Sequence, residues 1–264
     1  MTGVIRKPAV AGLFYPQDRQ ALEQTVTQLL SSVPTINVQQ PVKALIVPHA
    51  GYIYSGRIAA SAYAQLLPEK KQIHRVVLLG PSHRVGFRGL AVSQADYFRT
   101  PLGDIPIDRE SYNVLEDLSF VNEREDAHHE EHSLEVQLPF LQVVLDDFLL
   151  VPIVVGDAEP ADISRVIELL WGGPETVIII SSDLSHYLDY QHAQNMDAKT
   201  AKAIVSMNPE AIGYDQACGR LPVNGLLLAA KHHHLQSQLL DLRNSGDTAG
   251  TQDRVVGYGA FSLA

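Results

Sequence analysis

The chain has 264 residues, 45% of them hydrophobic and 19% charged, and its 30 acidic residues against 20 basic ones give a net charge of −10. That charge would repel a phosphate backbone, which argues against nucleic acid as a partner, and the apolar runs are too short to form a membrane-spanning helix. The single cysteine, Cys218, excludes an intramolecular disulfide, and the N-terminus lacks the pattern of a secretory signal. We therefore expect a cytoplasmic protein.

Short apolar runs rich in β-branched residues alternate along the chain with longer helical patterns. This alternation predicts an α/β fold in which helices flank a central, largely parallel sheet. The predicted strands are 42–47, 75–79, 149–155, 176–181, 236–243 and 255–262. The predicted helices are 19–31, 55–67, 109–117, 133–145, 161–170, 192–206, 209–217 and 222–232.

No linker rich in Gly, Ser or Pro divides the chain, and no internal repeat is visible. Residues 1–264 are therefore predicted to form a single domain. Segment 80–100 has only weak periodicity, so it is expected to be a long functional loop or a hairpin.

Polar residues follow three of the predicted strands at their carboxyl ends. His49 follows the first strand, His83 the second, and Asp183 and His186 the fourth. The carboxyl ends of parallel strands meet at one edge of a sheet, where α/β proteins bind ligands, so we expect these residues to converge. The three-residue spacing also suggests that Asp183 orients the imidazole of His186, as in a general acid/base pair.

The segment 126–139 is dense in titratable residues. Glu130 and Glu131 are typical of a helix N-terminus, where the helix dipole favours acidic side chains. His132 and Glu135 are harder to explain in this way, because a three-residue spacing places both on one helical face. We predict that they line the site.

Cys218 lies in a break between two helical patterns, close to Arg220. A helix N-terminus and an arginine favour the thiolate, whereas packing as a small apolar residue is the alternative. The run 232–234, three histidines, is interpreted as a solvated helix terminus, because consecutive residues at a helix end point in different directions.

Two imidazoles with one anionic ligand form the arrangement that holds Fe(II) in oxygen-activating enzymes. Here the anion would be Cys218 or Asp183, and a thiolate would also suit copper(I) or zinc. In a metal-free alternative Cys218 is a nucleophile with His186 or His49 as its base, which leaves two further histidines without a role. A third alternative is hydrolysis by a zinc-activated water, with His186 as the base.

Five motifs resemble, in order, those of the Memo family, known in bacteria and archaea as AmmeMemoRadiSam system protein B. They are PHAGYIYSG at 48–56, LLGPSHRVGF at 78–87, EEHSLEVQLPF at 130–140, SSDLSHY at 181–187 and ACGRLPVNG at 217–225. With RKPAVAGLFYP at 6–16, the resemblance extends from about residue 6 to residue 261. That family is similar in fold to the catalytic subunits of class III extradiol dioxygenases, which are non-haem iron enzymes.

The resemblance implies that His49, His83 and Cys218 occupy the family's metal-site positions, with Fe(II) as the first choice and copper or zinc as alternatives. Extradiol enzymes of this class use two histidines and a glutamate, and here Cys218 replaces the carboxylate. A thiolate donates more charge to the metal and is itself oxidisable, so ring cleavage does not follow from the fold alone.

The resemblance also implies that His186 is the acid/base group beside Asp183, and that Tyr54 and His132 line the cavity. The predicted function is a metal-dependent redox protein that acts on an unknown small molecule or peptide. The alternative is a non-catalytic module that binds a protein or peptide in the same cleft. The family name points to radical SAM system proteins as partners.

Overall fold

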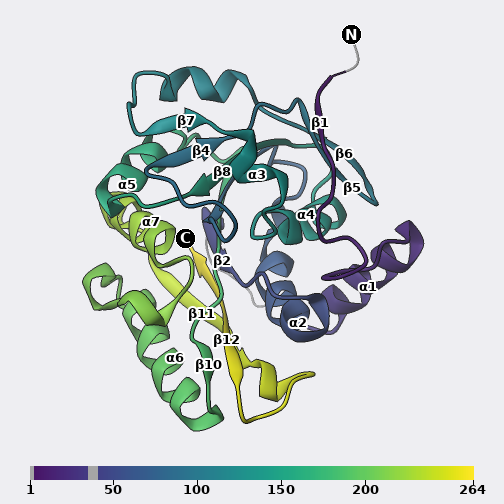
Figure 1. The fold of residues 1–264 in the computed structure, drawn as a ribbon, viewed down its shortest axis with the longest axis vertical. Helices are drawn as coiled ribbons and strands as arrows, with labels where there is room; N and C mark the ends of the chain where they lie inside the picture. Colours follow the sequence, from purple (N-terminus) through teal and green to yellow (C-terminus); the bar gives the residue numbers. More distant parts are fainter. Residues whose placement is uncertain (1–2, 35–40) are drawn as a thin grey trace.

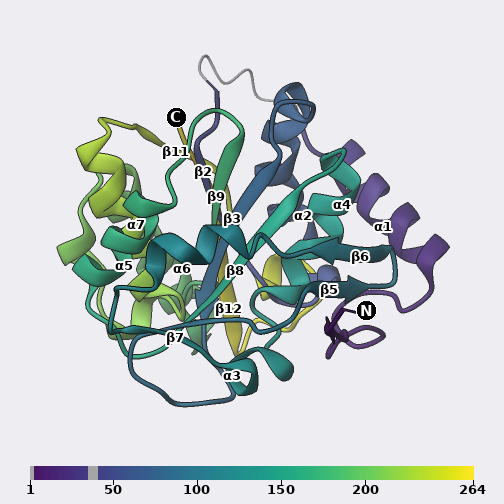
Figure 2. The same cartoon turned by 90° about the horizontal axis from the view of Figure 1, so that it is seen from above.

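The structure is a computed structural model that describes residues 3–34 and 41–264. Helices cover both faces of one large sheet, as Figures 1 and 2 show. They are α1 (Arg19–Ser31), α2 (Tyr52–Tyr63), α3 (Glu125–His129), α4 (Leu138–Val144), α5 (Pro160–Leu169), α6 (Tyr190–Val205) and α7 (Arg220–His232). Within the described ranges, no helix is both long and apolar enough to cross a membrane.

The large sheet contains nine strands in the described part of the chain. Eight follow one another in the order β10 (His186–Leu188), β12 (Val255–Leu263), β2 (Ala44–Val47), β9 (Thr176–Ser181), β3 (Arg75–Pro81), β8 (Leu149–Val155), β4 (Leu90–Val92) and β7 (Val121–Glu123). The ninth, β11 (Ser237–Asn244), pairs with β12. A small second sheet contains β1 (Ile5–Arg6), β5 (Tyr97–Thr100) and β6 (Gly103–Pro106).

Four neighbouring strands at the centre of the sheet, β2, β9, β3 and β8, all run parallel. Their carboxyl ends therefore lie along one edge, and the residues that follow them are brought together there. The strands outside this group include antiparallel pairs, such as β12 with β2 and β4 with β8. The mixed α/β fold with a parallel centre is the one that the sequence predicts.

The helices form two layers, one on each face of this sheet. In Figure 2, α5, α6 and α7 lie on one side, and α1, α2 and α4 lie on the other. The contacts agree, because α7 packs on β3 and β9, whereas α2 packs on β2 and β12.

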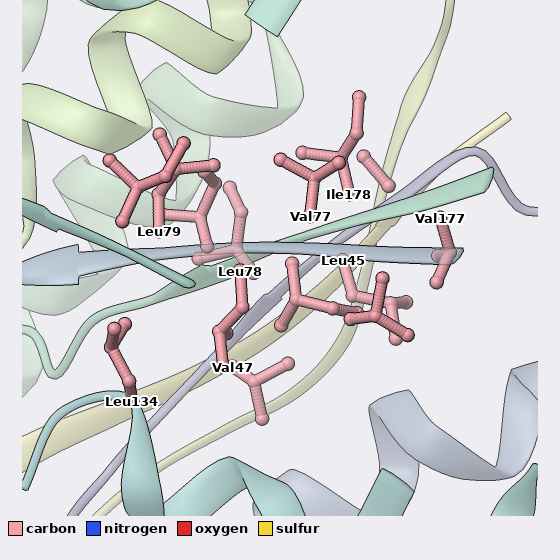
Figure 3. Close-up of a cluster of buried hydrophobic side chains, with 14 of the residues drawn as sticks. Leu45, Val47, Val77, Leu78, Leu79, Leu134, Val177 and Ile178 are labelled. Carbon is pink, nitrogen blue, oxygen red and sulfur yellow. The ribbon is translucent and has the colours of Figure 1, made fainter. Parts of the chain in front are cut away.

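The core consists of aliphatic side chains that alternate between the two faces of the central strands. Val77 and Leu79 on β3 point towards one helical layer, whereas Leu45 and Val47 on β2 point towards the other (Figure 3). All four are fully buried. Each contributes about 1.5–3 kcal/mol relative to an exposed position, so the strands that carry the site are held rigidly.

Several predicted elements differ in detail from the observed ones. The predicted helix 133–145 begins only at Leu138, because Pro139 is tolerated in the first turn but not in the middle of a helix. The predicted helices 109–117 and 209–217 are short 3₁₀ turns, Glu110–Leu115, Pro209–Ala211 and Tyr214–Gln216. Further 3₁₀ turns are Ala64–Glu69, Glu135–Gln137 and Ser245–Asp247.

Segment 80–100 contains two strands rather than one hairpin. β4 pairs with β8 and β7 in the large sheet, whereas β5 forms its hairpin with β6 in the small sheet. The two strands of the segment thus belong to different sheets. The loop before them, from Ser82 to Gly89, begins at the carboxyl end of β3.

Candidate metal centre

His49 is buried at the carboxyl end of β2, and its hydrogen bonds define its tautomer. Its Nδ1 atom lies 2.8 Å from the Oγ atom of Ser181, the last residue of β9. The Ser181 hydroxyl donates its only proton to the carbonyl oxygen of Ser133, at 2.6 Å, so it accepts from His49 Nδ1–H. The lone pair of His49 therefore lies on Nε2.

His83, which follows β3, is oriented by Glu131. The Glu131 carboxylate accepts from the backbone N–H of His83 at 2.6 Å and lies 2.9 Å from its ring Nδ1. Burial opposes ionisation of Glu131, but the hydrogen bonds and charge of His83, with a backbone bond from Ser133, hold its pKa at about 2. An ionised carboxylate only accepts, so the neutral form of the His83 ring has its proton on Nδ1 and its lone pair on Nε2.

His132 brings a third imidazole to the same place. Its ring centroid lies 4.5 Å from that of His83 and 5.5 Å from that of His49. One ring nitrogen from each of the three histidines lies within 4.8 Å of the others, and we call this set the central cluster.

The surroundings of His132 suit a metal ligand. Its Nδ1 atom is buried without a hydrogen-bond partner among the described residues, and the carboxylate of Glu131, 3.4 Å away, is not in hydrogen-bonding geometry. A buried nitrogen without a partner is costly unless an ion or water occupies the site. The sequence predicts only a cleft position for this residue.

Cys218 lies beside the central cluster, two residues before α7. Its Sγ atom is 3.4 Å from His49 Nε2 and accepts from the backbone N–H of Asp183 at 3.3 Å. Burial, helped by the charge of Asp183, raises the pKa of the thiol, contrary to the thiolate that its place near Arg220 and a helix N-terminus predicts. Desolvation outweighs the helix dipole here.

The pKa of His49 is shifted in the opposite direction. Burial, with the neighbouring histidines, holds it well below 6.5. Without metal, Cys218 and His49 are therefore a neutral thiol and a neutral imidazole. This differs from the thiolate–imidazolium pair of cysteine nucleophiles, so the metal-free alternative gains no support.

Asp183 and His186 lie in the site but do not form the predicted pair. The buried carboxylate of Asp183 accepts from the backbone N–H of His49 at 2.7 Å, and burial, opposed by that bond, raises its pKa to about 7. His186 Nδ1 instead donates to the carbonyl oxygen of Leu184 at 2.8 Å. The prediction that Asp183 orients His186 is wrong, because the backbone just before β10 supplies the acceptor, and the Asp183 carboxylate is bound to the backbone of His49.

Two cavities lie near the cluster. The larger, of about 800 Å³, is lined by His186 and Cys218 together with Tyr214 and Arg220. The smaller, of about 690 Å³, is lined by Tyr54 and by aromatic residues from the N-terminal segment. Of the predicted cleft residues, Tyr54 thus faces the second cavity.

Phe14 connects the second cavity to the cluster. It lines that cavity, and its ring centroid lies 5.0 Å from that of His132. Phe14 therefore lies between His132 and the second cavity.

Glu135 does not line either cavity. It is fully buried, and its carboxylate pairs with Arg6 and accepts from the backbone N–H groups of Ala9 and Val10 and from the Tyr15 hydroxyl. The predicted helical face does not exist here, because residues 135–137 form a 3₁₀ turn. Glu135 thus anchors the N-terminal segment and is not placed to bind a substrate.

Sequence reasoning missed Glu131 and Ser181 as positioning residues. Glu131 fits the pattern of a helix terminus, and Ser181 reads as the end of a strand. Their positions in the sequence could have indicated this role, because Glu131 directly precedes His132 and Ser181 lies two residues before Asp183. A histidine that binds a metal through one ring nitrogen commonly donates a hydrogen bond from the other to a carboxylate or another oxygen acceptor.

Comparison with known proteins confirms the family that the motifs resemble. The family described as Memo-like protein matches residues 6–262. A MEMO1 family protein of Aquifex aeolicus (strain VF5) is 38% identical over 266 residues, which cover 96% of this chain and 97% of that protein. One from Methanosarcina barkeri (strain Fusaro / DSM 804) is 36% identical over 271 residues, covering 97% and 99%.

Proposed function

Because the chain belongs to the Memo family, we propose that it is a metal-dependent redox protein in which His49, His83 and Cys218 hold Fe(II) or copper. One observation carries this proposal. His49 and His83 each give the proton of Nδ1 to a fixed acceptor, which leaves both Nε2 lone pairs free, and the Cys218 sulfur lies 3.4 Å from Nε2 of His49. Neutral, oriented imidazoles are the form in which histidine binds metals.

The donor set fits such an ion. Imidazole nitrogens suit iron, copper and zinc, and a thiolate adds affinity for copper(I) and zinc. His132 is close enough to act as a third imidazole ligand or to replace Cys218. A bound Fe(II) or copper ion would supply electron transfer and Lewis-acid chemistry.

His186 is the proton acceptor in this proposal. Its Nδ1–H is held by Leu184, and burial lowers its pKa, so the ring is neutral and Nε2 is available to take a proton. Because His186 lines the larger cavity, a hydroxyl or similarly acidic group of a bound substrate would reach it there. Asp183 positions the backbone of His49 and is an alternative ligand.

The substrate would be a small molecule or a peptide that enters the larger cavity. Tyr214 and Arg220 stand together in its lining, with the guanidinium 5.1 Å from the ring centroid. This arrangement suits an anionic or aromatic group. We place the reaction in the cytoplasm, where Cys218 would stay reduced. Radical SAM system proteins are the proposed partners.

A second candidate function is a module that binds a protein or peptide without catalysis. The observation that favours it is the exposure of aromatic rings near the cavity. Tyr214 is 80% exposed and Tyr187, which follows His186, is 64% exposed. Exposed tyrosines are frequent anchors in binding surfaces.

Oxygen consumption by the Fe(II)-loaded protein across a panel of catechols separates the two functions. The proposal predicts uptake with at least one compound, and its loss in Cys218→Ser and His186→Ala. His192→Ala, at an exposed position of α6, is the matched control and keeps the activity. If the wild-type protein consumes no oxygen with any compound of the panel but binds a peptide or protein, the binding module is favoured.

A further inference from the structure

A second group of potential metal ligands lies at the far end of α7. Glu168 on α5 faces His232, the last residue of α7, and His233, which follows it. His232 Nδ1 lies 2.9 Å from Glu168 Oε1, and His233 Nε2 lies 2.8 Å from Glu168 Oε2. We call these three residues the outer cluster.

This arrangement differs from the predicted solvated helix terminus. Consecutive residues do leave a helix end in different directions, but His232 uses Nδ1 and His233 uses Nε2, so both rings reach one carboxylate. Only His234 of the run takes no part in the cluster.

The geometry of the outer cluster suits a cation. One ligand atom from each residue lies within 4.8 Å of the others. Metal–nitrogen and metal–oxygen bonds of about 2.0–2.1 Å in a tetrahedral site place ligand atoms roughly 3.3 Å apart, so a small opening of the two hydrogen bonds would admit an ion. The His232 side chain is 77% exposed, which leaves room for water as a further ligand.

The scaffold of the outer cluster is well supported. The His233 ring stacks on Trp171 with the ring centroids 3.8 Å apart and the planes at 7°. Helices α5 and α7 pack closely, since Gly225 lies against Ile163, where a Cβ atom on the glycine would come within 2.5 Å. The carboxylate and the two imidazoles are thus held facing each other.

We propose that Glu168, His232 and His233 form a second metal site, which takes a borderline divalent transition-metal ion such as Cu²⁺, Ni²⁺ or Zn²⁺ from solvent. Two imidazoles and one carboxylate are a common donor set for such ions, and Cu²⁺ is expected to bind most tightly. To bind the ion, each ring moves the proton that now bonds to Glu168 to its other nitrogen by exchange with water, which frees the lone pair that faces the carboxylate. The site is separate from the central cluster, because α7 extends for about 18 Å between Cys218 and the outer cluster.

Trp171 provides a local probe, because it is the only tryptophan of the chain and stacks on a proposed ligand. Cu²⁺ is titrated into the full-length protein while tryptophan fluorescence is followed. We expect quenching that saturates, and protection when Zn²⁺ is present in large excess, because Cu²⁺ binds more tightly. Quenching that rises linearly without saturation would overturn the proposal.

Four variants make this test specific. His232→Ala and Glu168→Gln should weaken the quenching titration by about tenfold or more, whereas His234→Ala should leave it unchanged. The exposed His232 can be replaced without loss of folding, and it does not stack on the tryptophan. The quenching should persist in His83→Ala, since the central cluster is not its source. Unchanged affinity in His232→Ala, or lost quenching in His83→Ala, would contradict the proposal.

Discussion

Glu131 holds His83 at two points, accepting from its backbone N–H at 2.6 Å and from its ring Nδ1–H at 2.9 Å. These bonds aim the free Nε2 at the central cluster, so Glu131 should control metal affinity without being a ligand. We expect Glu131→Gln to weaken Co²⁺ binding by about 10–100-fold, measured by titration against a competing chelator. The exposed neighbour provides the control, as Glu130→Gln should bind like the wild type. Equal affinity in both variants would show that Glu131 has no positioning role.

Cys218 should be recognised directly in the spectrum of the Co²⁺-loaded protein. A thiolate ligand gives a sulfur-to-cobalt charge-transfer band, which the wild-type protein should show and Cys218→Ser should lack. His132→Ala should retain the band, because it removes an imidazole and leaves the sulfur. If the wild-type spectrum contains no such band, the metal is held by the three histidines alone.

The buried pair of Glu135 and Arg6 should contribute to stability and not to metal binding. Both side chains are almost fully buried, so Glu135→Ala leaves an unpaired charge inside the protein. We expect a loss of about 3–5 kcal/mol in the free energy of unfolding, measured with urea. The exposed pair of Arg99 and Asp104 is the control, and Asp104→Asn should cost less than about 1 kcal/mol. If Glu135→Ala is as stable as the wild type but binds Co²⁺ more weakly, Glu135 lines the cleft as the sequence predicts.

Asp197 on α6 should make stability depend on pH. Burial, opposed by a hydrogen bond from Ser185, raises its pKa to about 6. The folded state then holds this proton more tightly than the unfolded state, whose pKa is about 3.9, so Asp197 destabilises the fold progressively as the pH rises from about 4 to 6.

Asp197→Asn removes this ionisation. Its free energy of unfolding should exceed that of the wild type by on the order of 3 kcal/mol at pH 8, and by little at pH 4. Asp117→Asn, at an exposed position, controls for the change from carboxylate to amide. A difference between Asp197→Asn and wild type that stays constant with pH would refute the assignment.

Gly219 sets the position of Cys218 at the start of α7. A Cβ atom there would lie 2.6 Å from the side chain of Ser182 and 2.8 Å from the Ser181 carbonyl oxygen, so Gly219→Ala must shift the loop that carries the thiol. We expect weaker Co²⁺ binding and a reduced sulfur charge-transfer band. Gly86→Ala, which meets nothing within 4 Å, is the matched control. Normal Co²⁺ spectra in Gly219→Ala would show that the close packing is not needed.

The sequence predicted the sheet well where burial alone decides the structure. Strands 149–155 and 176–181 have their predicted bounds, because both are continuous apolar runs that only a central parallel strand accommodates. The strand β1 could not be predicted, since its two residues pair with β5, about ninety residues away. Such short edge strands depend on tertiary contacts and carry no periodicity of their own.

For the site, the sequence indicated that His49 and His83 would converge, since topology decides this. The sequence could not indicate that Glu135 forms an ion pair with Arg6, or that the His186 ring donates a hydrogen bond to Leu184 and not to Asp183. Those outcomes depend on local backbone geometry, a 3₁₀ turn in one case and a short returning strand in the other.

We propose above that His49, His83 and Cys218 hold a redox-active metal. The most direct test is elemental analysis of the protein purified without oxygen, with His49→Ala and Cys218→Ser purified in parallel. We expect about one equivalent of iron or copper in the wild-type protein, and a marked loss in both variants. Stoichiometric zinc would instead favour hydrolysis. A wild-type protein without any bound metal, and no change in His49→Ala, would show that this site does not bind a metal.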